Sequence, residues 1–443
     1  MTLEIRGGTV VTSLDPPSVL SSADVLIEDG RIVSVGEGAN AGDEVIDATD
    51  ALVIPGNVCA HHHLYSALAR GMPYRLEPPT TFVEILRRIW WRLDRALTPD
   101  DIWWSACVGA GEALLSGTTT VVDHHASPST IHGSLEQVLA GVSAPGARSI
   151  LAYEVTDRDG LDRAAEGLEE HRRFAKDLTV TSTLMVGAHA SFTLSDETLR
   201  ACVALANELD VGLHLHVAED LADQTDALAR TGRRVVERLA DAGALTDRTL
   251  LAHCVHVDDD EAATIRDAGA WVAHNARSNM SNRVGRAPLG ALGGNVALGT
   301  DGIDGDVFGE SKVAYWRAHE EDASVQPSWI LERVATSARF AATAFDEPLL
   351  GRLEAGAPAD AVILGYDAPS PISAENLASH WLYGISASDV RDVVVAGEVV
   401  VRDRHLLRID EPSSGQKSRA AAERLWERMD AIGEHPFEPI GAR

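Results

Sequence analysis

Positive charge is scarce in this chain. Its 443 residues include 38 lysines and arginines against 67 aspartates and glutamates, which gives a formal net charge of −29. A protein this acidic repels the phosphate backbone of nucleic acids and the surface of anionic membranes, so we expect neither as a partner. The acidic balance favours solubility, and a small molecule is the ligand that we expect.

Cysteine is scarce as well. The four cysteines, Cys59, Cys107, Cys202 and Cys254, are too few and too scattered for a disulfide framework. The chain also opens without the charged and apolar regions of a secretory signal. We therefore expect a reducing, cytoplasmic setting. Its length and 45% hydrophobic content allow a large buried core.

Three consecutive histidines follow the apolar run from Ala51 to Ala60. If the run is a strand, His61 and His63 point to one side and His62 to the other. Imidazole nitrogens are good ligands for borderline-soft divalent metal ions. The motif therefore predicts that His61 and His63 bind one metal ion.

Seven further apolar runs of similar character follow, and most end in groups that can bind a metal or activate its bound water. Helix-start signals separate them, for example Thr98 before Pro99 and Ser195 before Asp196. Eight strands that alternate with helices and carry polar residues at their ends predict an α/β fold, a (β/α)8 barrel with its site on the carboxyl face. The seven runs end at or near His125, Val155, His189, His216 with Glu219, His253, Asn279 and Asp301.

The motifs at these strand ends resemble those of the amidohydrolase superfamily. They are PGNVCAHHHLYSALARGM at the first strand, HVAED at the fifth, AHCVH at the sixth, HNARSNM at the seventh and LGTDG at the eighth. The resemblance covers nearly the whole chain and is best to the single-metal aminohydrolases and chlorohydrolases, which include guanine deaminase, methylthioadenosine/adenosylhomocysteine deaminase and triazine hydrolases. The stretches WWRLDRALT, VVDHHASP and YEVTDRDG are similar to the SsnA-type aminohydrolases.

Both ends of the chain indicate β-hairpins. Tight-turn signals at 28–31 and 396–398 lie between alternating apolar runs, and the segment from Ser414 to Glu434 has helical spacing. The resemblance implies that the two ends meet in a small β-sandwich beside the barrel. The expected domains are 1–54 for the first part of the sandwich, 55–350 for the barrel, and 351–443 for the rest of the sandwich with a carboxyl-terminal helix.

The resemblance also implies a metal site with an open position for water. Binuclear relatives bridge two ions with a carbamylated lysine or another group from the third or fourth strand, and none of the three lysines here lies at such a strand end. We therefore expect one divalent ion, with zinc as the first choice and Fe²⁺ or Mn²⁺ also suited to nitrogen and oxygen ligands. The expected ligands are His61, His63, His216 and Asp301.

Such a site would lower the pKa of bound water and form hydroxide near neutral pH. We expect Asp301 and His253 to receive the proton of this water. Glu219 is expected to protonate a ring nitrogen while hydroxide attacks the amino-bearing carbon, as in deaminases of heteroaromatic amines. The predicted reaction is the release of ammonia from an aminated heterocycle: a purine, nucleoside, pterin or triazine-like ring.

Substrate contacts follow from the same resemblance, which also makes a homodimer the expected assembly. Trp90 and Trp91 either stack on a flat ring or belong to the core. The residues expected at the substrate are His189, Arg70, His125 and Asn279.

Each polar residue also has a structural interpretation. Glu219 could begin a helix, His253 could be a core histidine, and Asp301 could form a turn, but one metal site explains them jointly. Two other functions stay open beside the deaminase. One is a hydrolase that releases chloride or an alkylamine from a triazine-like ring or opens a cyclic amide; the other is a catalytically silent metal-binding protein.

Overall fold

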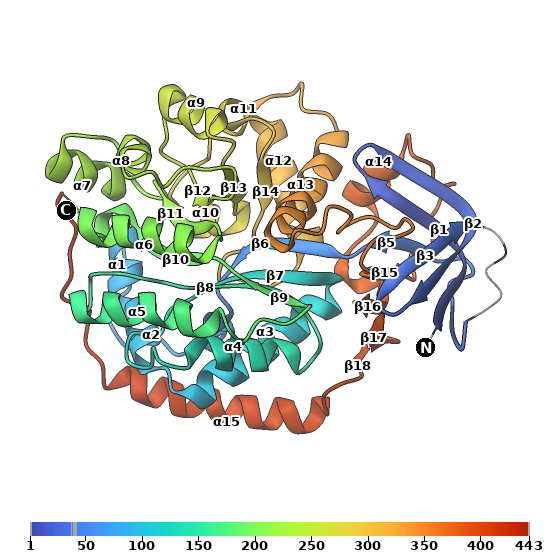
Figure 1. Cartoon of the computed structure of the whole chain (residues 1–443), viewed down its shortest axis with the longest axis horizontal. Helices are drawn as coiled ribbons and strands as arrows, with labels where there is room; N and C mark the ends of the chain where they lie inside the picture. Colours follow the sequence, from blue (N-terminus) through green and yellow to red (C-terminus); the bar gives the residue numbers. More distant parts are fainter. Residues whose placement is uncertain (1, 37, 39–41, 442–443) are drawn as a thin grey trace.

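The computed structural model describes residues 2–36, 38 and 42–441. Strands from the two ends of the chain lie side by side in one nine-stranded sheet, on the right in Figure 1. The remaining strands are parallel and are surrounded by helices. Among the described residues, no helix is long and apolar enough to cross a membrane.

The nine-stranded sheet is held together by pairing between distant segments. β5 pairs with β1 from the amino-terminal part and with β15 from the carboxyl-terminal part. The expected turns are confirmed: Asp29 and Gly30, and likewise Ala396 and Gly397, have the positive φ angles of a two-residue hairpin turn. The strands are β1 (Thr2–Leu14), β2 (Pro17–Glu28), β3 (Arg31–Gly36), β4 (Glu44–Asp47), β5 (Leu52–Pro55), β15 (Ala361–Leu364), β16 (Val390–Val395), β17 (Glu398–Arg402) and β18 (His405–Leu406).

The parallel strands form a four-stranded and a five-stranded sheet. Isolated bridges join their edges, His62 with Asp301 on one side and Val155 with Ala188 on the other. The first sheet contains β6 (Asn57–His62), β7 (Thr118–His125), β8 (Arg148–Tyr153) and β9 (Ser182–Leu184); the second contains β10 (Val186–Ala190), β11 (Leu213–Val217), β12 (Leu250–His253), β13 (Trp271–His274) and β14 (Val296–Leu298).

Two of the eight apolar runs are each divided into two strands. The first run bends at Gly56, whose N–H bonds to Asp360 O, so that β5 joins the terminal sheet and β6 the parallel one. A Cβ at Gly56 would lie 2.1 Å from Thr119 Oγ1, so the bend needs glycine. The fourth run divides at Met185, where the chain passes from pairing with β8 to pairing with β11.

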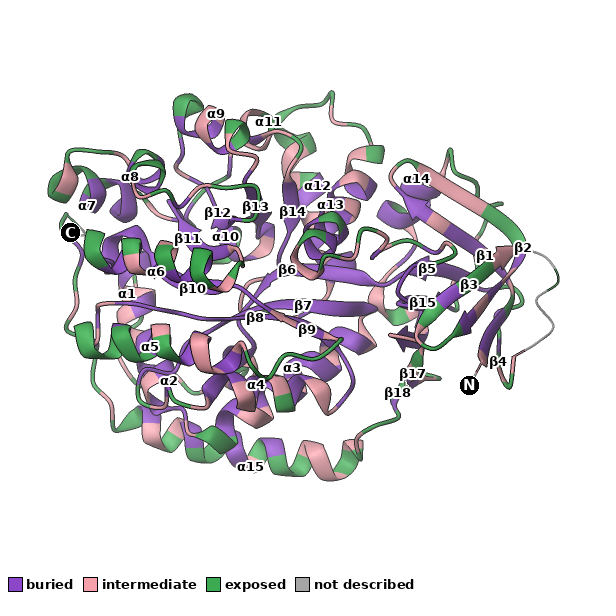
Figure 2. Cartoon of the chain, in the orientation of Figure 1, coloured by how far each residue is buried: buried purple, intermediate pink, exposed green. Residues whose placement is uncertain are grey.

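Helices cover the parallel strands, and their outward faces are exposed while the strands are buried (Figure 2). The predicted starts are confirmed, since Thr98 and Ser195 cap α3 and α6. The carboxyl-terminal helix begins at Glu411 and ends at Asp430, so it starts and stops earlier than expected. The α-helices are α1 (Phe82–Ile85), α2 (Trp91–Ala96), α3 (Pro99–Leu115), α4 (Ser134–Ser143), α5 (Leu161–Phe174), α6 (Asp196–Leu209), α7 (Leu221–Thr231), α8 (Val235–Asp241), α9 (Asp259–Asp267), α10 (Ala276–Ser281), α11 (Leu289–Leu292), α12 (Val307–Glu321), α13 (Ser328–Phe345), α14 (Leu377–Tyr383) and α15 (Glu411–Asp430). Short helical segments are η1 (Leu64–Ala69), η2 (Leu86–Trp90), η3 (Ser191–Thr193) and η4 (Ala387–Asp389).

Candidate active site

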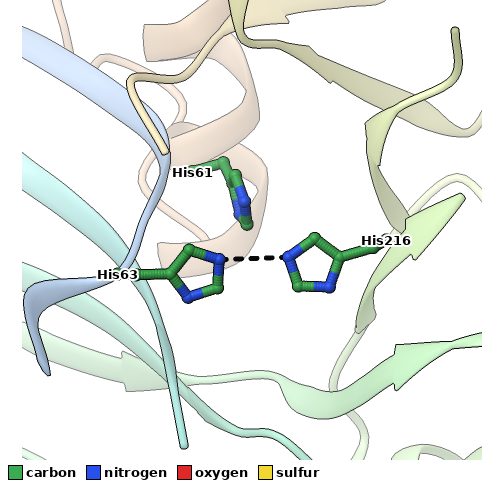
Figure 3. Close-up of side chains that lie close together, drawn as sticks. All are labelled: His61, His63 and His216. Atoms are coloured by element: carbon green, nitrogen blue, oxygen red, sulfur yellow. Dashed lines mark hydrogen bonds between the residues drawn. The ribbon is translucent and has the colours of Figure 1, made fainter. Parts of the chain in front are cut away.

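Three histidines from two parallel strands meet at the carboxyl ends of those strands (Figure 3). His61 lies near the end of β6 and His63 directly follows it, while His216 lies on β11. The Nε2 atoms of His63 and His216 are 3.1 Å apart, and each of the three side chains offers one nitrogen within 4.8 Å of the others. As the alternation of side chains along a strand predicts, His61 and His63 point to the same side and reach one cluster.

Backbone carbonyls fix the orientation of two of these rings. Nδ1–H of His63 donates to His124 O at 2.6 Å, and Nδ1–H of His216 donates to His189 O at 3.0 Å. In the neutral rings the Nε2 lone pairs then face each other, which is unfavourable without a cation between them. The arrangement fits a bound metal ion.

His61 completes the nitrogen set. Its Nδ1 lies 2.9 Å from His214 Nε2, and its own Nε2 is buried with no hydrogen-bond partner. Burial lowers the pKa of His61 and of His216 well below the ordinary value for histidine, so both rings stay neutral. Neutral imidazoles with free lone pairs are the form that binds metal ions.

Asp301 supplies a carboxylate beside the histidines. It follows β14 with a φ of +52°, and its Oδ1 lies 3.4 Å from His63 Nε2. Gly302 N–H donates to Oδ1 at 2.7 Å, and Ser278 Oγ–H donates to Oδ2. Burial alone would raise the pKa of Asp301, but His63, His253 and these two donors lower it overall. The carboxylate is therefore ionised and can serve as an oxygen ligand.

His253 lies between two carboxyl groups at the end of β12. Its Nδ1–H donates to Asn279 Oδ1 at 2.8 Å, so its Nε2 carries the lone pair. That Nε2 is 3.5 Å from Glu219 Oε2 and 3.8 Å from Asp301 Oδ2. Burial lowers the pKa of His253. A neutral ring in this position can accept a proton.

Glu219 lies beside the histidines, two residues beyond the end of β11. Burial, followed by the nearby Asp301 carboxylate, raises its pKa well above the ordinary value for glutamate. Asn282 Nδ2 donates to its Oε1 at 3.3 Å. A buried carboxyl group with a raised pKa keeps its proton at neutral pH and can act as an acid.

These groups open into one cavity of about 890 Å³, counting its open mouth. His63, His216, Glu219 and Asp301 are part of its lining. The apolar part of the lining is formed by Phe82, Leu86, Trp90, Trp91, Phe192 and Ile303.

The residues expected at the substrate are placed in different environments. His189 lines the cavity, with Nδ1 2.8 Å from Thr193 Oγ1. Arg70, His125 and Asn279 are not among the lining residues. Their side chains bond instead to protein groups: Arg70 to Glu112 at 2.6 and 2.8 Å, His125 to Ser127 at 2.9 Å, and Asn279 to His253.

Two acidic residues of the lining, Glu154 and Asp223, were absent from the sequence prediction. Glu154 reaches the cavity from the end of β8, and Arg158 Nη1 donates to its Oε1 at 2.6 Å. Arg158 also pairs with the buried Asp94 and lies 5.2 Å from the ring centre of Trp91. Glu154 precedes Val155, where the third run ends, so the strand-end rule could have found it. Trp90 and Trp91, which the sequence left open between stacking and core, both line the cavity, whereas no sequence signal identifies Asp94, Phe82, Leu86 or Phe192.

Comparisons with known proteins find matches that cover nearly the whole chain. Residues 52–400 match the model of the Amidohydrolase family. The chain is 33% identical over 437 residues to 5-methylthioadenosine/S-adenosylhomocysteine deaminase of Halobacterium salinarum, covering 96% of this chain and 98% of the relative. It is 32% identical over 444 residues to 5'-deoxyadenosine deaminase of Methanopyrus kandleri, covering 96% and 99%. A crystal structure of an adenosine deaminase from Xanthomonas campestris with bound zinc matches with a TM-score of 0.84 at 25% identity, covering 97% of this chain and 99% of that one.

Proposed function

This chain belongs to the Amidohydrolase family, as an enzyme that acts on C–N bonds, and from that premise we propose that it is a metal-dependent deaminase of an aminated heterocycle. One observation carries the proposal. A buried, protonated Glu219 lies 3.5 Å from the free nitrogen of His253, beside a cluster of neutral histidines with an ionised aspartate. Acid, base and metal ligands thus share one cavity.

The side chains at this point fit a divalent ion. His61, His63, His216 and Asp301 would hold it, and three nitrogens with one oxygen suit zinc, as in the zinc-bound relative from Xanthomonas campestris. When bound, such an ion lowers the pKa of a coordinated water toward 7. We propose a single ion, because none of the three lysines lies at the end of the third or fourth strand, from which binuclear relatives bridge a second ion.

The protein groups divide the proton transfers between them. Glu219 holds a proton that it donates to a ring nitrogen, which makes the adjacent amino-bearing carbon more electrophilic. His253, oriented by Asn279, and the ionised Asp301 receive the proton of the attacking water. One of these groups then returns a proton to the amino group, which leaves as ammonia.

Within this class we propose adenine nucleosides first, and the names of the relatives support that choice. Two of them are named as deaminases of 5-methylthioadenosine and S-adenosylhomocysteine or of 5'-deoxyadenosine. The cavity supports a flat aromatic substrate, because Trp90, Trp91 and Phe192 line it together with Glu219. His189 would contact the substrate from the side of β10.

The same proposal includes a closed (β/α)8 barrel for the parallel strands. The bridges from His62 to Asp301 and from Val155 to Ala188 support closure, since they join the edges of the two sheets. We assign the terminal strands to a β-sandwich, with the domains at 1–54, 55–350 and 351–443. A homodimer and a cytoplasmic location stay predictions.

Ammonia release tests the function directly. The zinc-loaded protein is assayed against aminated purines, nucleosides, pterins and triazines, with a chelated sample in parallel. Metal-dependent ammonia from one class supports the deaminase. Release of chloride or an alkylamine without ammonia would assign the chain to the second hydrolase class, and silence with one ion per chain would favour a catalytically silent protein.

A further inference from the structure

The charged residues around the cavity restrict the substrate further. We infer that the enzyme acts on aminated heterocycles that carry no phosphate or carboxylate, and discriminates against their anionic congeners. The inference rests on the proposed function and deepens it.

Every acidic or basic residue in the cavity lining, apart from its histidines, is acidic. The four are Glu154, Glu219, Asp223 and Asp301, and among the residues that the structure describes the lining contains no lysine or arginine. Arg158, which donates to Glu154 Oε1 at 2.6 Å, lies outside the lining. A phosphate or carboxylate entering this space would therefore find no lysine or arginine in the described lining to bind it.

Three guanidinium groups beside lining residues are already committed to acids. Arg158 lies behind Glu154 with its side chain 1% exposed, and it bridges two acids at once. A guanidinium held in such a buried pair cannot turn to a ligand without leaving the acids unpaired. The committed pairs are Arg158 with Asp94 and Glu154, Arg70 with Glu112, and Arg277 with Asp304 and Glu310.

The apolar side of the cavity adds a second penalty. If the reacting ring lies at Glu219, a substituent on that ring is left to the rest of the lining, which includes Phe82, Leu86 and Ile303. Burial of an anion against these three side chains removes its hydration and offers no hydrogen bond in return. A methyl, methylene or thioether substituent buries its surface there favourably.

Matched substrate pairs test the inference. The pairs are adenosine with its 5'-monophosphate and pterin with pterin-6-carboxylate. kcat/KM for ammonia release is measured with the zinc-loaded protein, and affinity with the zinc-loaded Glu219→Gln variant by calorimetry. For the pair that is turned over, we expect the uncharged member to be favoured about 100-fold in kcat/KM and to bind more tightly.

The outcomes separate this inference from the proposed function. Ammonia released equally well from both members of a pair, or faster from the anionic one, would overturn the inference and leave the deaminase intact. No ammonia from any pair would overturn the deaminase of these rings and the inference with it.

A charge placed on the apolar side sharpens the test. Ile303 is 37% exposed and lines the cavity, so a longer polar side chain can be accommodated there. We expect Ile303→Arg to reduce the preference for the uncharged member about tenfold. Ile303→Gln is the matched control, because it removes the apolar side chain without adding charge, and its preference should fall less than that of Ile303→Arg. An unchanged preference in Ile303→Arg would contradict the electrostatic origin of the discrimination.

Discussion

The two sides of the cavity are built in opposite ways. The floor, defined as His61, His63, His216, Glu219 and Asp301, comes from positions on or within three residues of parallel strand ends. Its ring orientations are set by neighbouring strands, as when His216 bonds to His189 O. Residues of the floor that lie one to three positions apart in the sequence are therefore also neighbours in the fold.

The outer wall, defined as Phe82, Leu86, Trp90 and Trp91, comes from one segment between η1 and α3. It is held by the distant end of the chain. His435 N–H donates to Arg87 O at 3.0 Å, and Arg87 Nε–H donates to His435 O at 2.9 Å.

Trp91 shows how closely the tail holds the outer wall. It is 1% exposed, and its ring centre lies 5.3 Å from that of His435 and 5.8 Å from that of Phe437. His189 faces it at 5.9 Å. The comparison indicates that the catalytic residues of the floor and the residues of the outer wall that shape the cavity come from different parts of the chain. Changes in the floor should lower kcat, and changes that loosen the outer wall should raise KM.

Metal removal should have the largest effect on the floor. Chelation should abolish ammonia release, a loss of at least about 10⁴-fold, because the attacking water then keeps its high pKa. His63→Ala should do the same by removing a ligand. Metal analysis beside the ammonia assay checks this, and added Zn²⁺ should restore the chelated parent but not the variant. Full turnover in the metal-free protein would remove the metal from the mechanism.

The second largest effect is expected at Glu219, the acid of the floor. Glu219→Gln should lower kcat about 10³-fold, because the amide cannot donate a proton to a ring nitrogen, while the metal content stays that of the parent. Glu208→Gln on the outside of α6 is the control and should behave as the parent, since its partner is the exposed Arg172. Normal turnover in Glu219→Gln would show that the proton comes from another group.

The difference between the two sides also explains which parts the sequence could predict. His61 with His63, and His216 with Glu219, each lie within one short motif, and parallel strands bring such motifs to one edge. The caps Thr98 and Ser195 are local in the same sense, because a helix start involves only a few consecutive residues.

The rest depended on contacts between distant segments. The run from Ala51 to Ala60 shows no change in polarity at Gly56, because the strands on both sides are buried, and only the pairing of β5 with β15 separates them. The packing of Phe437 on Trp91 joins two segments that lie far apart in the sequence. Neither segment carries a sequence signal that identifies the other as its contact.

Loosening the outer wall should give a moderate and different effect. Phe437→Ala removes a half-buried ring from Trp91, so we expect KM to rise about tenfold while kcat changes less than twofold. Phe437→Leu should recover most of the affinity, because it restores apolar contact. Steady-state kinetics on the best substrate of the panel measures both constants. A fall in kcat with unchanged KM would show that the tail acts on the chemistry and would break the comparison.

The smallest effect is expected at Arg70, which the family resemblance directed toward the substrate. Its side chain is 54% exposed and forms a two-pronged pair with Glu112 outside the cavity. Exposed ion pairs contribute about 0–1 kcal/mol, so Arg70→Ala should change the free energy of unfolding by no more than that.

For the same reason Arg70→Ala should change kcat/KM less than twofold, and Glu112→Ala should match it, since each variant breaks the same pair. Denaturant unfolding and steady-state kinetics on the two single variants and the double variant separate stability from binding. A tenfold rise in KM for Arg70→Ala alone would mean that the guanidinium leaves Glu112 when substrate binds. Arg70 would then belong to the cavity, and a cationic side chain would be available to an anionic substrate after all.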